Sequence, residues 1–238
     1  MRGTYRSLDF VVVGTEFRHC QGVYDTIRLA NGIPLEVECP TCIRPKDVRE
    51  QITRFPEGQF VAVITENGEE KVIGAATLMR TDYPPTAPPL PWKAMIGTKG
   101  LANHDPDGRW LYGVEIAVRP AYQRRGVASA LYRARLGLVE KIGLRGWYAG
   151  GVLFGYHRYR KQMSPREYGW KVIRHELYDP TVTMQLNQGL EAMGVIENYY
   201  PESRAGNAAV LIVWQPDGKR AVQKRGKAAH TRPDEARL

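Results

Sequence analysis

The chain has 238 residues, 43% of them hydrophobic, and a formal net charge of +9 from 34 basic and 25 acidic side chains. A chain of this length can bury a substantial core, so we expect a single folded domain over residues 1–215. No apolar run approaches the roughly 20 residues that span a bilayer, and the N-terminus MRGTYRSLDF lacks a signal peptide's apolar segment, which excludes a membrane protein and predicts a cytoplasmic one.

The first half of the sequence alternates between helical and extended patterns. The expected elements are a strand over Leu8–Val13, a helix over Val23–Ala30, a helix over Pro45–Phe55, and strands over 59–64 and 71–79. Pro45 occupies a favourable first helical position. Asn67-Gly68, between the last two strands, is a strong hairpin signal, so the first half should end in an antiparallel pair.

The three cysteines are too few for a disulfide framework, which suits a reducing compartment. Cys39 and Cys42 form a C-x-x-C, and His19 with Cys20 could complete a tetrahedral zinc site. An adjacent His-Cys pair is a poor chelating spacing, however. We therefore favour a plain loop with two thiols over a metal site.

Residues 81–109 interrupt the pattern with six prolines and no clear period. A loop of this length in a compact domain is usually functional or mobile. A substrate-facing flap that includes Trp92 and an uninvolved surface loop are the two alternatives.

The second half again alternates. The expected elements are a strand over Trp110–Val118, a helix over Val127–Ile142, a strand over Trp147–Val152, a helix from Ser164-Pro165 to about Leu177, a helix from Asp179-Pro180 closed by Gly189, and strands over 190–200 and 208–214. A helix that connects two strands implies parallel pairing with a right-handed crossover. The last two strands should form a hairpin.

The chain ends in a basic segment. Nearly half of the net positive charge lies from Pro216 onward, where apolar residues are few, so we expect residues 216–238 to be a disordered tail. A solvated tail is the simpler interpretation. Weak contact with nucleic acid or another acidic surface is the alternative.

The turn between Val118 and Val127 has the features of a phosphate site. The first amides of a helix lack intrahelical partners and carry partial positive charge. Gly126 would let a ligand oxygen approach the backbone, and Arg124 and Arg125 add charge with a geometry suited to phosphate oxygens. The sequence contains neither G-x-x-x-x-G-K-[ST] nor G-x-G-x-x-G after a strand, so P-loop and Rossmann sites lose their main support.

The same turn resembles a known family. Gln123-Arg124-Arg125-Gly126-Val127-Ala128 fits the Q/R-x-x-G-x-G/A signature of the GNAT superfamily of acyl-CoA-dependent N-acyltransferases. Further stretches look like the acyltransferase domain that some bacterial proteins fuse to a nitrilase-like carbon–nitrogen hydrolase: 55–63, 103–118, 155–159, 176–181 and 185–189. This chain is too short to hold such a hydrolase.

The resemblance implies a mixed α/β fold with a splayed, mainly antiparallel sheet flanked by helices and a C-terminal β-hairpin. Acetyl-CoA, or another acyl-CoA, would be the co-substrate. Its pantetheine arm would pair with backbone at Ile116, Ala117 and Val118, and its diphosphate would lie on the segment from Gln123 through Ser129, with Arg124, Arg125, Gly126, Val127 and Ala128 between them. Val118, with Ala117 as second choice, would supply the amide that polarises the thioester carbonyl.

Transfer to an amine needs a base and an acid. Glu115, on the central strand, is the expected base, with a structural ion-pair role as the alternative, and Tyr112 is a further catalytic candidate. Strict alternation places Glu115 on the face opposite Tyr112 unless a bulge intervenes. At the position of Gln185, many family members carry a tyrosine that acts as the general acid. Glutamine cannot donate a proton in that way.

Other candidates for the acid lie in the insertion after Val152. They are Tyr156, His157, Tyr159 and Tyr178, each more readily explained by packing or by surface exposure. Two functions follow. The first is transfer of an acetyl or short acyl group to a primary amine on a small molecule or a protein, and the second is a catalytically silent acyl-CoA-binding module that docks onto a partner such as a separate hydrolase. A homodimer rests on family analogy alone.

Overall fold

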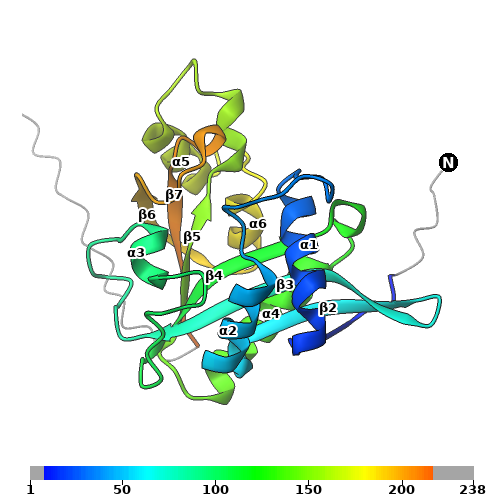
Figure 1. The fold of residues 1–238 in the computed structure, drawn as a ribbon. Helices are drawn as coiled ribbons and strands as arrows, with labels where there is room; N and C mark the ends of the chain where they lie inside the picture. The colour runs from blue at the N-terminus through cyan, green and yellow to red at the C-terminus, as the bar shows by residue number, and fades with distance from the viewer. Residues whose placement is uncertain (1–7, 217–238) are drawn as a thin grey trace, which may run out of the picture.

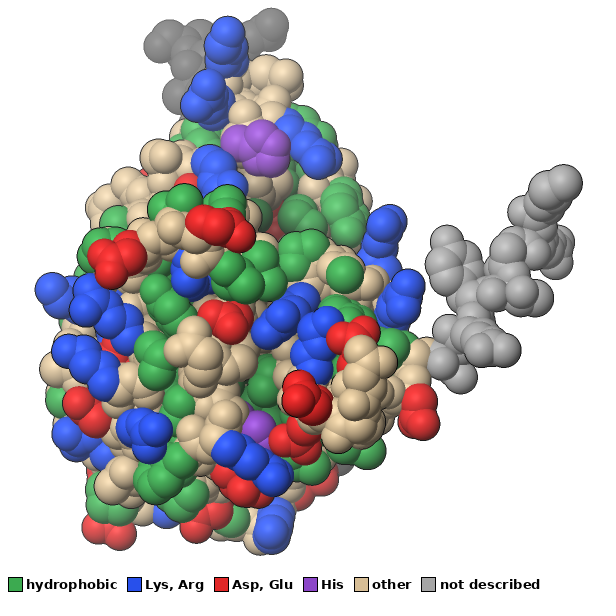
Figure 2. Space-filling view, turned by 45° about the vertical axis from the view of Figure 1, so that its right-hand side comes forward, with side chains coloured by type: hydrophobic (Ala, Val, Ile, Leu, Met, Phe, Trp, Pro, Cys, Tyr) green, Lys and Arg blue, Asp and Glu red, His purple; other side chains and the backbone are tan. Residues whose placement is uncertain are grey.

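The computed structural model describes residues 8–216. Apart from Pro216, the basic tail expected at 216–238 lies outside the described residues. Within them, no helix is both long enough and apolar enough to cross a membrane. On the face shown in Figure 2, basic and acidic side chains are interspersed.

The centre of the fold is a seven-stranded mixed sheet in the order β1-β2-β3-β4-β5-β7-β6 (Figure 1). Its strands are β1 Val11–Gly14, β2 Gln59–Glu66, β3 Glu69–Thr81, β4 Trp110–Val118, β5 Gly146–Val152, β6 Glu191–Ile196 and β7 Ala209–Trp214. β4 and β5 pair in parallel, and every other neighbouring pair is antiparallel. The expected mainly antiparallel sheet, parallel β4–β5 pair and closing hairpin are confirmed.

Helices cover both faces of the sheet. They are α1 Cys20–Ala30, α2 Pro45–Arg54, α3 Trp92–Ile96, α4 Val127–Lys141, α5 Pro165–Ile173 and α6 Val182–Asn187. Figure 1 shows α1 and α2 on the near face and α4 on the far face. Val23 and Ile27 of α1 pack with Ala117 of β4, whereas Val127 and Leu131 of α4 pack in a cluster that contains Val118. β4 is therefore covered on both sides.

The β2–β3 hairpin confirms the Asn-Gly signal. Asn67 has φ 54° and Gly68 has φ 82°, the two positive values that a tight two-residue hairpin turn requires. The turn residues thus set the register of the two strands next to the turn, and a bulge between Ala62 and Val63 shifts it by one residue farther along.

Several boundaries differ from those expected. β1 begins at Val11 rather than Leu8, and α1 begins three residues before Val23, at Cys20. The Ser164 hydroxyl accepts from the Glu167 amide at 3.1 Å and caps α5, but that helix ends at Ile173 rather than near Leu177. His175 follows with φ 59°, which no right-handed helix can contain.

The start of α6 is set by a side chain rather than by Pro180. Asp179 Oδ1 accepts hydrogen bonds from the amides of Thr181 and Val182 at 2.9 and 3.0 Å. The carboxylate satisfies the first free amides, and the helix begins at Val182. Gly189 has φ 81° and follows the helix, as expected for a stop signal.

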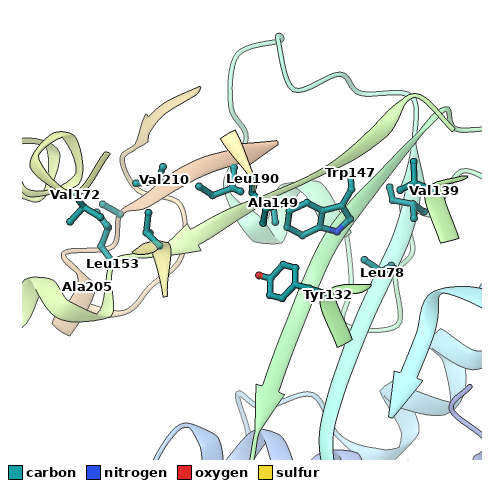
Figure 3. Packing of buried hydrophobic residues seen from close by; sticks show 14 of the residues in the cluster. Leu78, Tyr132, Val139, Trp147, Ala149, Leu153, Val172, Leu190, Ala205 and Val210 are labelled. Carbon is teal, nitrogen blue, oxygen red and sulfur yellow. The ribbon is translucent and has the colours of Figure 1, made fainter. Parts of the chain in front are cut away.

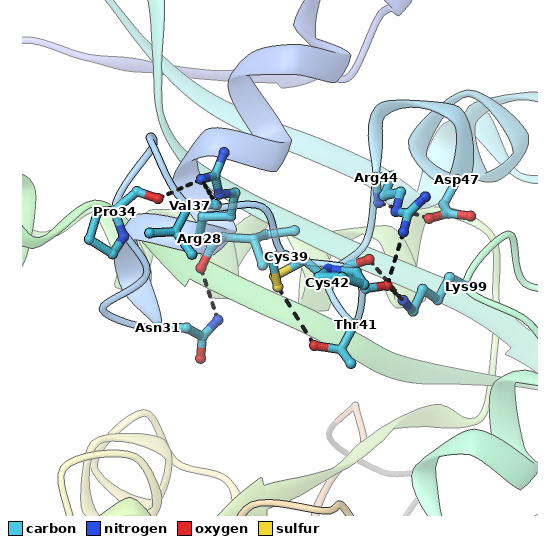
Figure 4. Close-up of a disulfide and its surroundings, with 12 residues drawn as sticks. Arg28, Asn31, Pro34, Val37, Cys39, Thr41, Cys42, Arg44, Asp47 and Lys99 are labelled. Carbon is cyan, nitrogen blue, oxygen red and sulfur yellow. Dashed lines mark hydrogen bonds between the residues drawn. A yellow bond between two sulfur atoms is a disulfide. The ribbon is translucent and has the colours of Figure 1, made fainter.

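The expectation of two thiols in the C-x-x-C loop is wrong. Cys39 and Cys42 form a disulfide, with Cα atoms 5.3 Å apart. Figure 4 shows the surrounding loop held by basic side chains: Lys99 Nζ donates to the Cys42 carbonyl at 2.9 Å, and Arg28 donates to the Val37 carbonyl. Over residues 8–216 no three His, Cys, Asp or Glu side chains gather as a metal site would require.

His19 lies apart from this disulfide. Its Nε2 is 2.7 Å from Glu70 Oε1, and its Nδ1 accepts from the Glu16 amide at 2.9 Å. It therefore helps to cap the turn before α1. Cys20 is a buried free thiol.

Candidate functional site

The site is built on a bulge in β4. Thr77 of β3 pairs with Glu115 and Leu78 pairs with Gly113, so Val114 has no opposing residue. Along its other edge, β4 pairs with β5 only from Trp110 to Tyr112. We call the unpaired edge beyond that point, from residue 113 to residue 118 beside β5, the split.

The ladder with β3 decides which amides face the split. The Arg119 amide donates to the Ile73 carbonyl at 2.9 Å. Because bonded and non-bonded pairs alternate in an antiparallel ladder, the amide of Ala117 also faces β3, whereas the amides of Ile116 and Val118 face the split. Consistent with this, Gln123 Nε2 donates to the Val118 carbonyl at 3.0 Å.

The bulge also changes which side chains share a face. Tyr112 and Val114 belong to one cluster, which includes Tyr148, whereas Ile116 packs on the opposite face with Val127 of α4. Strict alternation would have placed Tyr112, Val114 and Ile116 on one face. The extra residue breaks that alternation directly before Glu115.

Glu115 places a carboxyl group at the split. The residue is half-buried, and its Oε1 accepts from the Ile116 amide at 3.0 Å. Burial raises the pKa of this carboxyl to about 7, against the lowering effects of that amide and of Arg135. A group with this pKa can accept a proton near neutral pH.

Arg135 lies beneath Glu115 on α4. It is 1% exposed, its Nη2 donates to the Glu115 carbonyl, and its Nε has no hydrogen-bond partner among the described residues. The guanidinium lies 5.4 Å from the ring centroid of Tyr132 and 5.9 Å from that of Trp147. A buried cation at this place favours the ionised form of Glu115.

Tyr132 is a candidate that the sequence analysis missed. It is 1% exposed and packs edge-on against Trp147 at 5.8 Å in the cluster drawn in Figure 3. Burial raises the pKa of its hydroxyl, which therefore stays protonated. In the sequence, its place on the apolar face of the helix predicted only that the side chain packs in the core. Nothing in the sequence indicated which polar group its hydroxyl contacts.

That polar group is Gln185, the residue at the expected acid position. Gln185 is 3% exposed, and its Nε2 donates to the Tyr132 hydroxyl at 2.9 Å. Its Oε1 has no partner in the described part of the chain. A Cβ at Gly151 would lie 2.2 Å from that oxygen, so the glycine allows Gln185 to approach β5.

The turn before α4 is open to a ligand. Gln123, Arg124, Arg125 and Gly126 are all exposed. Gly126 has φ 85° and caps the helix, and Arg124 has φ 59°. The exposed arginines and the left-handed glycine leave the backbone of the turn accessible.

The first turn of α4 supplies the free amides. Ala130 donates to the Gly126 carbonyl at 3.0 Å, so the amides of Val127, Ala128 and Ser129 precede the first helical bond. The Val127 side chain is buried, and the Ser129 hydroxyl is 3.2 Å from Gln188 Nε2. The geometry is that of a helix N-terminus prepared for an anion.

The segment 81–109 reaches the same site and contains α3. Trp92 Nε1 donates to the carbonyl of Val114, the bulge residue, at 2.9 Å, and its ring meets Tyr200 edge-on at 5.3 Å. This contact favours the interpretation of the segment as a substrate-facing flap rather than an uninvolved surface loop.

The other candidate acids lie elsewhere: the Tyr156 hydroxyl donates to the Met163 carbonyl at 3.1 Å, and Tyr178 is 64% exposed.

Tyr112 is part of a buried tyrosine pair. Its hydroxyl is 2.6 Å from that of Tyr199, which accepts from the Gly150 amide at 3.3 Å. Burial raises the pKa of Tyr112 well above its ordinary value and that of Tyr199 to about 12. Both hydroxyls are neutral at physiological pH and line a small cavity beneath the flap.

Comparison with known proteins places this geometry in context. Residues 33–157 match the model of the Acetyltransferase (GNAT) family. The chain is 32% identical over 186 residues to "Probable hydrolase YhcX" of Bacillus subtilis (strain 168), which covers 76% of this chain but only 36% of YhcX. It is 29% identical over 164 residues to "Uncharacterized N-acetyltransferase YkwB" of the same organism, covering 69% of this chain and 71% of YkwB.

A solved structure shares the fold. The GphF GNAT-like decarboxylase in complex with isobutyryl-CoA superposes with a TM-score of 0.67 at 20% identity, covering 86% of this chain and 98% of GphF. The expected GNAT-like architecture is confirmed, with its splayed sheet and closing hairpin.

Proposed function

This chain belongs to the GNAT acetyltransferase family, and from that premise we propose that it transfers an acetyl or another short acyl group from acyl-CoA to a primary amine. One observation carries the proposal. The Glu115 carboxyl, whose pKa is raised to about 7, lies beside a strand edge that β5 leaves unpaired, and the amides of Ile116 and Val118 face that split. A candidate base and two candidate oxyanion donors therefore lie next to one another at the split.

The residues present fit acyl-CoA. The amides after Gly126 and the exposed side chains of Arg124 and Arg125 would hold the diphosphate. The pantetheine arm would follow the free edge of β4 and bond at Ile116 and Val118. This arrangement puts the thioester level with Glu115.

The reaction is direct attack by the amine on the thioester carbon. Glu115 takes a proton from the attacking nitrogen, the C–N bond forms, and the carbonyl oxygen gains negative charge. An amide that faces the split stabilises that charge: Val118, or Ile116 once the Glu115 carboxyl has turned away. Collapse of the intermediate breaks the C–S bond.

The leaving thiolate then needs a proton. Tyr132 is the donor that the site offers, because its hydroxyl is buried, protonated and held by Gln185 Nε2 at 2.9 Å. Gln185 is in this account a positioning residue. It replaces the tyrosine of related enzymes and orients a tyrosine from another helix.

The experiment is to incubate the protein with acetyl-CoA and a panel of primary amines at pH 8 and to follow free thiol. We expect Glu115→Gln to lower the rate by about 10²-fold to 10⁴-fold, the usual contribution of a general base. Glu140→Gln, on the exposed face of α4, is the matched control and should leave the rate unchanged. Equal rates for wild type and Glu115→Gln would contradict the proposal.

The catalytically silent acyl-CoA-binding module is the second candidate, and Gln185 is the observation that favours it. Glutamine at the acid position cannot protonate a thiolate. This alternative predicts that CoA binds, that no amine releases thiol, and that Tyr132→Phe changes nothing. Thiol release that depends on Tyr132 would exclude it.

A further inference from the structure

We propose that the Cys39–Cys42 bridge undergoes reversible thiol–disulfide exchange with a dithiol, and that this exchange switches the flap, residues 81–109, between a held and a released form. The expected effect on the acceptor rests on the proposed function, whereas the exchange and the release do not. The bridge joins residues three positions apart in the loop between α1 and α2. A bridge across so short a loop restricts the unfolded chain less than a long-range bridge does.

One end of the bridge is open to attack. The Cys39 side chain is 5% exposed, whereas Cys42 is half-buried, so an incoming thiolate meets Cys42 first. Attack on the Cys42 sulfur forms a mixed disulfide and releases Cys39 as a thiolate. The second thiolate of the dithiol then attacks the reductant's own sulfur and releases Cys42. The dithiol leaves as a disulfide, having given two electrons, and its two protons pass through solvent to the two cysteines.

The surroundings of the bridge favour the leaving thiolate. The Thr41 hydroxyl lies 3.6 Å from Cys39 Sγ, and because a bridged sulfur carries no hydrogen, the hydroxyl is the donor. Two cations face the same turn (Figure 4): Lys99 Nζ donates to the Cys42 carbonyl at 2.9 Å, and Arg44 Nη2 donates to another carbonyl of the turn at 3.4 Å. Cations beside a C-x-x-C pair stabilise the thiolate and so assist exchange.

Lys99 connects the bridge to the flap. Lys99 belongs to the flap, whereas the two carbonyls that its Nζ binds, those of Pro40 and Cys42 at 3.2 and 2.9 Å, belong to the turn that the bridge closes. Burial lowers the pKa of Lys99, so its ammonium group depends on these acceptors in place of water. At the next residue, a Cβ at Gly100 would lie 2.9 Å from the Glu50 Cβ, so the flap packs directly against α2.

The same lysine leads to the proposed base. Its backbone carbonyl accepts from Gln51 Nε2 at 2.7 Å, and Gln51 Oε1 accepts from Thr77 Oγ1 at 3.3 Å. Gln51 is 1% exposed, and Thr77 pairs with Glu115 across the β3–β4 ladder. A chain of hydrogen bonds through Lys99 and Gln51 therefore joins the bridge to the residue opposite Glu115.

Reduction should loosen the flap at the place where the acceptor reacts. Without the covalent link, the carbonyls of the turn lose their fixed positions and no longer hold Lys99. The flap contacts the bulge through the Trp92 indole, which donates to the Val114 carbonyl at 2.9 Å. The amine must meet Glu115 beside that bulge, so its kcat/KM should fall on reduction. CoA, held at residues 123–129, should bind as before.

The test compares oxidised and reduced protein, with dithiothreitol as the dithiol and its cyclic disulfide as the oxidant. After the reductant is removed, the acylated form of the amine that wild type uses best is measured by mass spectrometry. We expect kcat/KM to fall by about fivefold or more on reduction and to recover on reoxidation. The double variant Cys39→Ser, Cys42→Ser should match reduced wild type under both conditions. Cys20→Ser, at the buried free thiol, is the control and should respond as wild type does.

Lys99→Met tests the connection itself. In this variant kcat/KM should be equal in the oxidised and reduced forms and near that of reduced wild type, although thiol titration still shows the bridge opening and closing. Lys93→Met, at an exposed lysine of the flap, is the matched control and should keep the wild-type response. Equal CoA affinity by calorimetry shows that all variants are folded. A Lys99→Met variant that responds as wild type does would overturn the inference.

Hydrogen exchange separates this inference from the proposed function, because it needs no acceptor. Amides of residues 92–101 should exchange faster after reduction, and those of β5 and β7 should not change. A bridge that dithiothreitol does not open in the folded protein, or an opening that changes neither flap exchange nor kcat/KM, would overturn the inference. Faster flap exchange in a protein that acylates no amine would support the switch and contradict the proposed function alone.

Discussion

Replacing Glu115 by glutamine should stabilise the folded protein at high pH. The carboxyl has its pKa raised to about 7 by burial, whereas an unfolded chain would leave it near the ordinary value of about 4.3. Between these two values the unfolded state releases the proton more readily than the folded state. The free energy of unfolding therefore falls as pH rises through this window, and the full cost is present above pH 7.

The size of the effect follows from the gap between the two pKa values. At about 1.4 kcal/mol for each pKa unit, this gap costs the folded state about 3–4 kcal/mol once the group is ionised. Glutamine has the same shape as glutamate. Its Oε1 can still accept from the Ile116 amide, which in the wild-type protein lies 3.0 Å from the carboxyl oxygen. The pKa of about 7 already includes the attraction to buried Arg135, and because Glu115 is only half-buried, solvent screening makes about 3–4 kcal/mol an upper bound.

The assay is urea unfolding of wild type, Glu115→Gln and the exposed control Glu140→Gln at pH 4.5 and pH 8. At pH 8, Glu115→Gln should be more stable than wild type by about 1–3 kcal/mol, and at pH 4.5 the difference should fall to a few tenths. The control should follow wild type at both values. A Glu115→Gln variant that is no more stable than wild type at pH 8 would show that this carboxyl is not perturbed as described.

Four further changes test separate parts of the site. Gly126→Val forces a branched residue to φ 85° and should weaken CoA binding at least tenfold by calorimetry, and an unchanged affinity would count against the phosphate turn. Tyr132→Phe should slow thiol release by about 10²-fold at constant CoA affinity, whereas an unaltered rate would remove it as the acid. Trp92→Phe removes the bond to the bulge carbonyl and should raise the acceptor KM severalfold; an unchanged KM would mean that the flap does not position the acceptor. Cys39→Ser opens a short loop and should lower the free energy of unfolding by about 2 kcal/mol in urea, while no loss would mean that the disulfide contributes nothing.

Local signals in the sequence predicted most of the fold. The β4 bounds Trp110–Val118 agree with the expectation because the strand is buried on both faces and reads as one apolar run. The helix that follows begins at Val127 as expected, directly after Gly126, and ends one residue early, at Lys141 rather than Ile142. Where the pattern depended on side-chain bonds, as at Asp179, the expected boundary was displaced.

Less of the site could be predicted from the sequence. The bulge at Val114 depends on the pairing with β3, which no local pattern in β4 encodes. The Tyr132–Gln185 hydrogen bond joins residues 53 positions apart, and each residue alone suggested something else. The C-x-x-C loop was misjudged because spacing alone cannot tell two thiols from a bridge. These features depend on contacts that local sequence patterns do not reveal.

The central claim is that the amides at the start of α4 hold the diphosphate of CoA and so direct the thioester into the split beside Glu115. Calorimetry with CoA and with pantetheine, which lacks the diphosphate, tests it most directly. We predict that wild type binds CoA at least tenfold more tightly than pantetheine and that Gly126→Val removes this difference. Equal affinity of wild type for the two compounds, or no measurable heat with CoA, would contradict the account.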